Sequence, residues 1–174
     1  EYPKVLAVFA IAGGPTTPAS LSLRRIRLKI TGKHTINAPR DQVWQRLIDP
    51  DSIAACLPGV ETLDKVGDDE YSMAMNIGIG MVKGTYTGKV RLSNMNEPTD
   101  YQMYVEGSGR PGFIKGTGSV RLAEGENSTT EIEYNGDVEV GGPVGAVAQR
   151  MLGGVANRMV GQFFGCVESK ITGE

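Results

Sequence analysis

The sequence predicts an α+β fold in which a curved antiparallel sheet of about seven strands wraps round a long C-terminal helix. Three observations support this prediction. Apolar and polar residues alternate in several segments, two short helical patterns follow the first strand, and residues 143–171 carry apolar side chains at helical spacing. Because the apolar face of a sheet needs a cover, we expect the long helix to lie against it.

Length and charge limit the class of protein. The chain has 174 residues, with 18 Lys and Arg against 20 Asp and Glu. This length suits one domain, which we place at residues 24–174. A net charge of -2 offers no basic excess for phosphate groups, which argues against a nucleic-acid-binding protein. Residues 1–23 combine a charge, a short apolar stretch and small residues, so we interpret them as a flexible leader or a start foreign to the native protein.

The first strand and the two short helices are justified by local signals. From Arg24 the pattern alternates strictly. Ile26, Leu28, Ile30, Gly32, His34 and Ile36 share one parity and polar residues share the other, which is typical of a half-buried strand. Pro39 then starts the first helix, because proline suits the first helical position. The second helix is expected over residues 52–57 and is ended by Pro58 and Gly59.

The remaining strands and the long helix follow in order. Alternation predicts strands within residues 60–66, 71–79, 86–92, 101–105, 114–122 and 132–140. Pro143 then begins the C-terminal helix. Its apolar stripe drifts after Gly153 and Gly154, so we expect a bend or a broad buried face there.

Several motifs carry a resemblance to a known family. They are HTINAP at 34–39, CLPGVE at 56–61, KGTYTGKV at 83–90, GFIKGTG at 112–118 and YNGDVEVGGP at 134–143. From about Leu28 to Ile171 the sequence resembles the G-subunit family of carbon monoxide dehydrogenase, within the SRPBCC (START/Bet v 1-like) superfamily. The resemblance implies the helix-grip fold. It also implies an accessory protein of an aerobic, molybdenum-containing carbon monoxide dehydrogenase or a related hydroxylase, without a catalytic role of its own.

Helix-grip proteins typically hold a cavity between the sheet and the long helix, and the inward residues here are its candidate lining. They are Leu57, Tyr71, Met73, Met75, Ile77, Tyr86, Met103, Val105, Ile114, Tyr134, Met151, Val155 and Met159. Flexible Met side chains adapt to irregular apolar ligands, and Tyr supplies a polar tip that can orient one. The alternative is that these residues simply fill the core.

Charged residues on the first and last strands take the outward parity. Arg25, Arg27, Lys29 and Lys33 form a basic row, and Glu131, Glu133, Asp137 and Glu139 form an acidic one. In a helix-grip sheet these two strands are neighbours. We therefore predict a cross-strand ladder of opposite charges, each pair worth about 0.2–1 kcal/mol.

Residues that could carry sharper chemistry are few. His34 is the only histidine and lies on the inward parity; without a visible partner we interpret it as a hydrogen-bonded structural residue. Cys56 and Cys166 lack the density of a disulfide scaffold, and we interpret them as free, buried thiols. We predict no metal site and no cofactor.

Phe113 is expected near a loop tip, flanked by Arg110 and Lys115. An exposed aromatic beside two basic residues would suit a partner protein or a membrane surface. The alternative is a Phe113 ring folded back over the mouth of the cavity.

The predicted function is a non-enzymatic protein that binds an extended apolar molecule, a quinone or a lipid. It is expected to work beside a carbon monoxide dehydrogenase-type enzyme, in the cytoplasm or peripherally on the inner face of the membrane, where it assists assembly or links the enzyme to the membrane. The runner-up is a small enzyme of the cyclase or hydratase type, with His34 or a cavity tyrosine as acid or base. A third interpretation is a structural adaptor whose core is filled.

Overall fold

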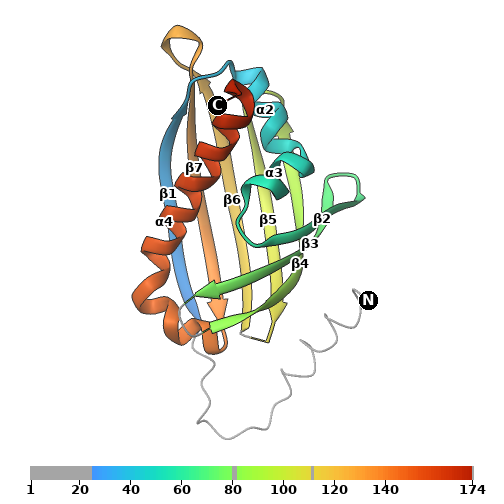
Figure 1. Cartoon of the computed structure of the whole chain (residues 1–174), viewed down its shortest axis with the longest axis vertical. Coiled ribbons are helices and arrows are strands. Elements are labelled where there is room, and N and C mark those ends of the chain that lie inside the picture. Colours follow the sequence, from blue (N-terminus) through green and yellow to red (C-terminus); the bar gives the residue numbers. More distant parts are fainter. Residues whose placement is uncertain (1–24, 80–81, 111, 174) are drawn as a thin grey trace, which may run out of the picture.

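The described part of the chain contains a seven-stranded antiparallel sheet with three helices on one of its faces (Figure 1). The elements in chain order are β1 (Ile26–Ile36), α2 (Arg40–Ile48), α3 (Pro50–Cys56), β2 (Val60–Gly67), β3 (Glu70–Ile79), β4 (Val82–Asn96), β5 (Asp100–Gly109), β6 (Gly112–Glu124), the short helix η1 (Glu126–Ser128), β7 (Thr130–Gly141) and α4 (Pro143–Thr172). The strand order is β1-β7-β6-β5-β4-β3-β2. This is the helix-grip fold, as the sequence predicts.

The computed structural model describes residues 25–79, 82–110 and 112–173. Within these ranges, the side chains of residues 77–79, 82, 143, 144 and 146–157 are not described. The predicted leader, residues 1–23, lies outside the described part.

The two short helices begin at the signals that the sequence offers. Pro39 adopts an extended conformation directly before α2, and Pro50 opens α3. The carboxylate of Asp49 caps α3, because it accepts hydrogen bonds from the backbone N–H (3.2 Å) and the hydroxyl (2.6 Å) of Ser52. The hydroxyl of Ser52 also holds the pKa of Asp49 below its ordinary value. Both helices therefore have fixed starting points beside the sheet.

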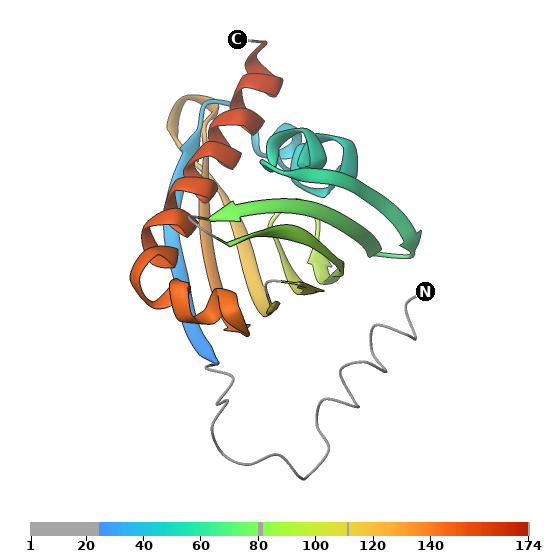
Figure 2. The ribbon, with the colours of Figure 1, turned by 60° about the horizontal axis from the view of Figure 1, so that its bottom comes forward.

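The main hydrophobic core lies at one end of the sheet, where α2, α3 and the C-terminal half of α4 meet the strands (Figure 2). We call this cluster the end core. Its buried members are Ile36, Ala38, Val43, Trp44, Leu47, Cys56, Tyr71, Leu92, Tyr101, Val120, Leu122, Ile132, Phe164 and Val167. Inside it, the Trp44 and Tyr101 rings meet edge to face at 5.5 Å. The buried Thr130 hydroxyl donates to the Ala38 carbonyl (2.7 Å), which ties β7 to the start of α2.

The cysteines correct one expectation. Cys56 at the end of α3 and Cys166 in α4 form a disulfide, with their Cα atoms 5.4 Å apart, so the interpretation as free thiols is wrong. The fold brings the end of α3 against α4, and a sequence separation of 110 residues carries no sign of that contact. The bond joins the short helices to the long one covalently.

The predicted charge ladder is present on the outer face of the sheet. Strands β1 and β7 pair along their whole length, and the ladder contains the ion pairs Arg25–Glu139 (3.4 Å) and Lys33–Glu133 (3.9 Å). The alternation continues across the sheet, since Glu139 lies opposite Lys115 of β6. Because opposite charges face each other, the neighbouring strands can carry many charged side chains on this face.

Helix α4 presents two glycines to solvent, and they give a first testable prediction. Gly161 and Gly165 are exposed, and a Cβ atom added at either would meet nothing within 4 Å. Each substitution by Ala is expected to raise the free energy of unfolding by about 0.5–1 kcal/mol, because glycine loses more backbone entropy in a helix. Urea denaturation measures the change. Gly173→Ala is the control of opposite sign, because Gly173 ends α4 at φ 78, where a side chain is strained.

A gain in stability at Gly173 equal to that at Gly161 would contradict the prediction, because it would show that helix propensity is not the cause.

Figure 2 also shows the first turns of α4 running at an angle to the rest of the helix.

Candidate functional site

The candidate site is the concave face of the sheet, which we define as the inward side of β1 and β3–β7 beyond the end core. Figure 2 shows that the sheet curls and that α4 runs along this side. Inward positions are identified by their parity with buried core residues, such as Leu92 on β4 and Leu122 on β6. The alternation predicted from the sequence therefore places most of the candidate lining on one surface.

Glycines occupy many of the inward positions in the middle of this surface. They are Gly32, Gly88, Gly107, Gly116, Gly118 and Gly136. The strand register sets Gly88 opposite Gly107 and Gly118 opposite Gly136. Because a glycine adds no side chain above the backbone, these pairs form a low glycine floor. The Tyr134 ring covers Gly32, and the Met103 side chain lies against Gly118.

Burial changes along the concave face. Residues in the end core are buried. Near the other end, Val140 is the buried centre of a second, small cluster, but the other inward apolar residues there keep part of their surface exposed. These half-buried residues are Ile26, Leu28, Ile30, Met75, Val105, Ile114 and Val138. Apolar side chains that line a concave surface and stay partly exposed are typical of a site that a ligand completes.

The structure places the predicted lining residues as follows. Tyr71 and Tyr86 are buried; Leu57, Met73, Met75, Met103, Val105, Ile114, Tyr134 and Met159 are half-buried; and the side chains of Ile77, Met151 and Val155 lie outside the described residues. The lining from β3 to β7 shares the concave face. Met103 and Tyr134 pack against the end core. These two residues therefore mark the border between the core and the open part of the concave face.

An aromatic cluster closes the concave face where it meets the end core. The imidazole of His34 stacks on the Phe164 ring of α4, with ring centroids 5.2 Å apart, and Tyr134 approaches the same ring at 5.6 Å. Within the described residues, no hydrogen bond to the His34 side chain is found. The expected hydrogen-bonded histidine is therefore a stacked one, which the sequence could not show because Phe164 lies far along the chain.

Tyr86 holds a buried polar group on this surface. The residue is only 4% exposed, and its hydroxyl has no hydrogen-bond partner in the described part of the chain. Burial raises its pKa, so the phenol stays protonated at neutral pH. Sequence reasoning found Tyr86 as a lining residue, but parity alone could not show that its hydroxyl lacks a partner.

Phe113 follows the turn between β5 and β6, but its ring takes neither predicted position. It lies half-buried on the outer face, against the backbone of Gly141 on β7, with the Arg25 guanidinium 5.8 Å from the ring centroid. Gly141 permits this because it has no side chain. Lys115 reaches the Tyr104 ring (5.9 Å), and Arg110 is exposed. The expected exposed aromatic tip is thus a strand residue packed against its own sheet.

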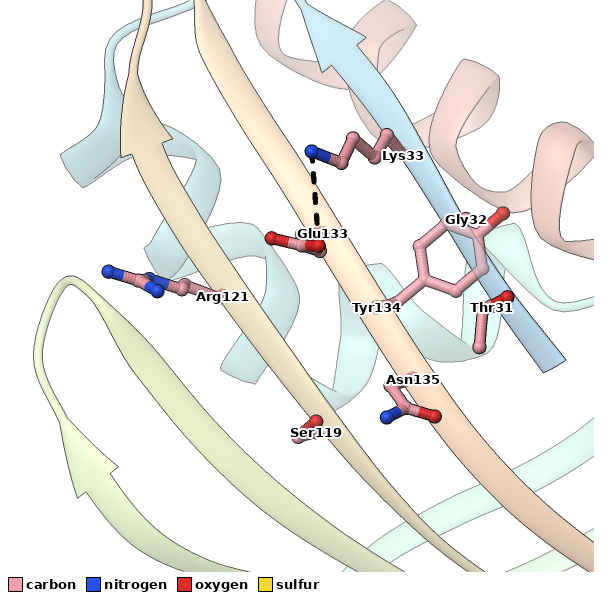
Figure 3. A pocket seen from close by; sticks show the side chains of 8 residues that line it. All are labelled: Thr31, Gly32, Lys33, Ser119, Arg121, Glu133, Tyr134 and Asn135. Carbon is pink, nitrogen blue, oxygen red and sulfur yellow. Dashed lines mark ion pairs between the residues drawn. The ribbon is translucent and has the colours of Figure 1, made fainter. Parts of the chain in front are cut away.

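Two hollows lie on the outer side of the sheet. The one in Figure 3, of about 420 Å³, is lined by Thr31, Gly32, Lys33, Ser119, Arg121, Glu133, Tyr134 and Asn135. The other, of about 630 Å³, lies over β5 and β6. Tyr134 is the single predicted lining residue that borders either of them. Polar side chains dominate both hollows, so they do not match the apolar site that the sequence predicts.

Two further features were sought among the described residues, a cluster of metal-ligating side chains and a membrane-spanning helix. No group of three or more His, Cys, Asp or Glu side chains in the described ranges is arranged to hold a metal ion. Among the helices described, none is both long enough and apolar enough to cross a membrane.

Comparison with solved structures defines the class of protein first. A Streptomyces aromatase/cyclase superposes with a TM-score of 0.62 at 17% identity, covering 83% of this chain and 93% of that one. A truncated norcoclaurine synthase from Thalictrum flavum gives 0.59 at 13% identity, covering 86% and 96%. At such identities the likeness shows the fold alone, which is the helix-grip fold.

The family follows from the sequence match. The family model of the carbon monoxide dehydrogenase G subunit, CoxG, matches residues 32–172. The chain therefore belongs to the CoxG family. A conserved protein from Geobacillus kaustophilus is 34% identical, with a TM-score of 0.80 and coverage of 83% of this chain and 95% of that one. Among the curated proteins, none matches this chain.

Proposed function

We propose that this protein binds an extended apolar molecule on its concave face and serves as a non-catalytic accessory of a carbon monoxide dehydrogenase-type molybdenum enzyme. The observation that carries the binding proposal is the partly exposed apolar surface around the glycine floor. This surface includes Ile30 of β1 and Val105 of β5. Membership of the CoxG family supports the choice of partner enzyme. In this proposal, binding of the apolar molecule serves either to assist assembly of that enzyme or to link the enzyme to the membrane or to a quinone.

A quinone or a lipid is the proposed cargo. Both are largely apolar, and an apolar molecule gains free energy when a concave protein surface removes it from water. The adaptable Met75 and Met103 side chains suit a ligand of irregular shape. The proposed location is the cytoplasm or the inner face of the membrane.

The non-catalytic part of the proposal rests on the chemistry of the inward positions. On the described inward positions of β1 and β3–β7, the titratable side chains are His34, tyrosines and Glu124, and Glu124 lies at the end of β6, where it is paired with Arg40 of α2 (3.0 Å). General acid–base chemistry needs a second positioned group, and His34 is engaged in stacking on Phe164. This arrangement favours holding a ligand over transforming it.

Ligand identity can be tested directly. Native mass spectrometry of freshly purified protein, followed by organic extraction, should find a lipophile in stoichiometric amount. Replacing Met103 by Lys should abolish its retention without unfolding the protein. A protein that stays free of ligand even after quinones and lipids are added would sink the binding proposal and favour the adaptor with a filled core.

A larger side chain in place of a glycine of the floor tests whether there is room for a ligand between the sheet and α4. The three atoms nearest to a Cβ atom added at Gly136 are backbone atoms of the neighbouring strands β6 and β1, the first being the Thr117 oxygen at 3.4 Å. Gly136→Val is therefore expected to weaken ligand binding by about tenfold or more, because the valine occupies the ligand's volume. Protein stability should stay equal or rise, since glycine weakens a strand interior.

The matched control is Gly67→Val, at an exposed glycine of β2 with similar room around its Cβ. It should leave ligand binding unchanged. If the core above Gly136 were filled, Gly136→Val would instead cost about 1–3 kcal/mol through overpacking. A urea denaturation curve with that loss, together with unchanged binding, would overturn the proposal.

A further inference from the structure

Tyr86 combines three properties that together point to a specific contact. It lies near the start of β4 on the concave face, opposite Met75 of β3 and Gly109 of β5. Its side chain is more than nine-tenths buried, at 4% exposure. Its hydroxyl oxygen nevertheless has no hydrogen-bond partner within the described ranges.

A buried hydroxyl without a partner needs an explanation. Nearly all buried polar groups in folded proteins are hydrogen-bonded, because an unmade bond carries the full desolvation cost of the group. The other two such atoms in the described residues are the indole nitrogen of Trp44 and Nε of Arg40, which belong to helix α2. Tyr86 differs from both because it lies outside the end core and faces the proposed ligand.

An ordered water is a poor substitute for the missing partner. A buried water requires two to four polar neighbours. The cross-strand neighbours of Tyr86 are Met75 and Gly109, and the next inward residue along β4 is Gly88. These positions of the sheet therefore supply no polar side chain to hold such a water, and we consider a bound molecule as the source of an acceptor.

We propose that the Tyr86 hydroxyl donates a hydrogen bond to a carbonyl oxygen of the bound apolar molecule. The site then selects carbonyl-bearing lipophiles over hydrocarbons of the same shape. This inference rests on the proposed function, because it names the chemistry of the ligand at the same site. The raised pKa of Tyr86 agrees with it, since the phenol remains a donor at neutral pH.

The test compares a quinone with a hydrocarbon of the same ring skeleton and adds an ester as a second carbonyl probe. Dimethylnaphthoquinone and dimethylnaphthalene share a ring skeleton, and a fatty acid methyl ester represents the carbonyl of a lipid. Affinities are measured by equilibrium dialysis for the wild type and for Tyr86→Phe. The variant should bind a carbonyl probe about fivefold to thirtyfold more weakly, the equivalent of one hydrogen bond, and the hydrocarbon equally well.

The control variant is Tyr101→Phe, which alters another buried tyrosine of the same sheet, inside the end core. It should leave all three affinities unchanged. Selective loss for the naphthoquinone identifies a quinone-type acceptor, and selective loss for the ester identifies a lipid; either result supports the inference. Equal affinities of the wild type and Tyr86→Phe for every probe would overturn this inference. The proposed function would still stand in that case, because both proteins would bind the apolar probes.

Two further outcomes are decisive. If the wild type binds none of the probes, the proposed function fails and this inference fails with it. Denaturation of the ligand-free proteins gives an independent measurement, because Tyr86→Phe removes a hydroxyl that has no partner and should not lower the urea midpoint. A clearly lowered midpoint would reveal a partner within the protein and would overturn the inference.

Discussion

Loss of the Cys56–Cys166 disulfide is expected to lower the free energy of unfolding by about 2–5 kcal/mol. The bond joins residues that are 110 positions apart, so it restricts the unfolded chain strongly. It also holds the end of α3 against α4, where both helices contribute to the end core. The measurement is urea denaturation of the oxidised protein and of the same protein after reduction.

The double variant Cys56→Ser with Cys166→Ser is the control for the reductant. It should match the reduced protein and should not respond to reductant itself. An unchanged urea midpoint on reduction would contradict the prediction, because the disulfide would then not restrict the conformations of the unfolded chain. Thiol trapping in cells tests the proposed cytoplasmic location, because disulfides persist in oxidising compartments and are rare in the cytosol. A fully oxidised Cys56–Cys166 pair in cells would contradict that location.

The fold could be predicted because its signals are local and periodic. Alternation with a period of two assigned the inward face of each strand, and the apolar spacing of residues 143–171 assigned α4. The neighbouring positions of β1 and β7 came from the helix-grip topology, and the ion pair Lys33–Glu133 confirms them. The disulfide could not be predicted, since no local pattern reports where α3 meets α4.

The candidate site was predictable only in part, for a related reason. Parity selected inward residues such as Met75 and Val105, but it cannot tell which of them a helix covers. The register that pairs Gly118 with Gly136 across two strands also cannot be seen in the sequence. The position of the Phe113 ring depends in the same way on its cross-strand neighbour Gly141.

Replacement of Phe164 by Ala is expected to cost about 3–5 kcal/mol of stability, because it removes a large ring and leaves a cavity in the core. Phe164 is 4% exposed and is the point where α4 meets the sheet. Its ring stacks on His34 of β1, lies 5.6 Å from Tyr134 of β7 and contacts Phe163 edge to face at 5.3 Å. Such ring pairs add to the burial of apolar area.

Phe163→Ala is the matched control, because it removes the same side chain one position away, where the ring is only half-buried. Its cost should be clearly smaller. Both variants are compared by urea denaturation with the Cys56–Cys166 bond kept oxidised, since the disulfide and Phe164 hold the same half of α4. Equal losses for the two phenylalanines would contradict the prediction, because α4 would then be held by its general apolar surface and not by the Phe164 ring between β1 and β7.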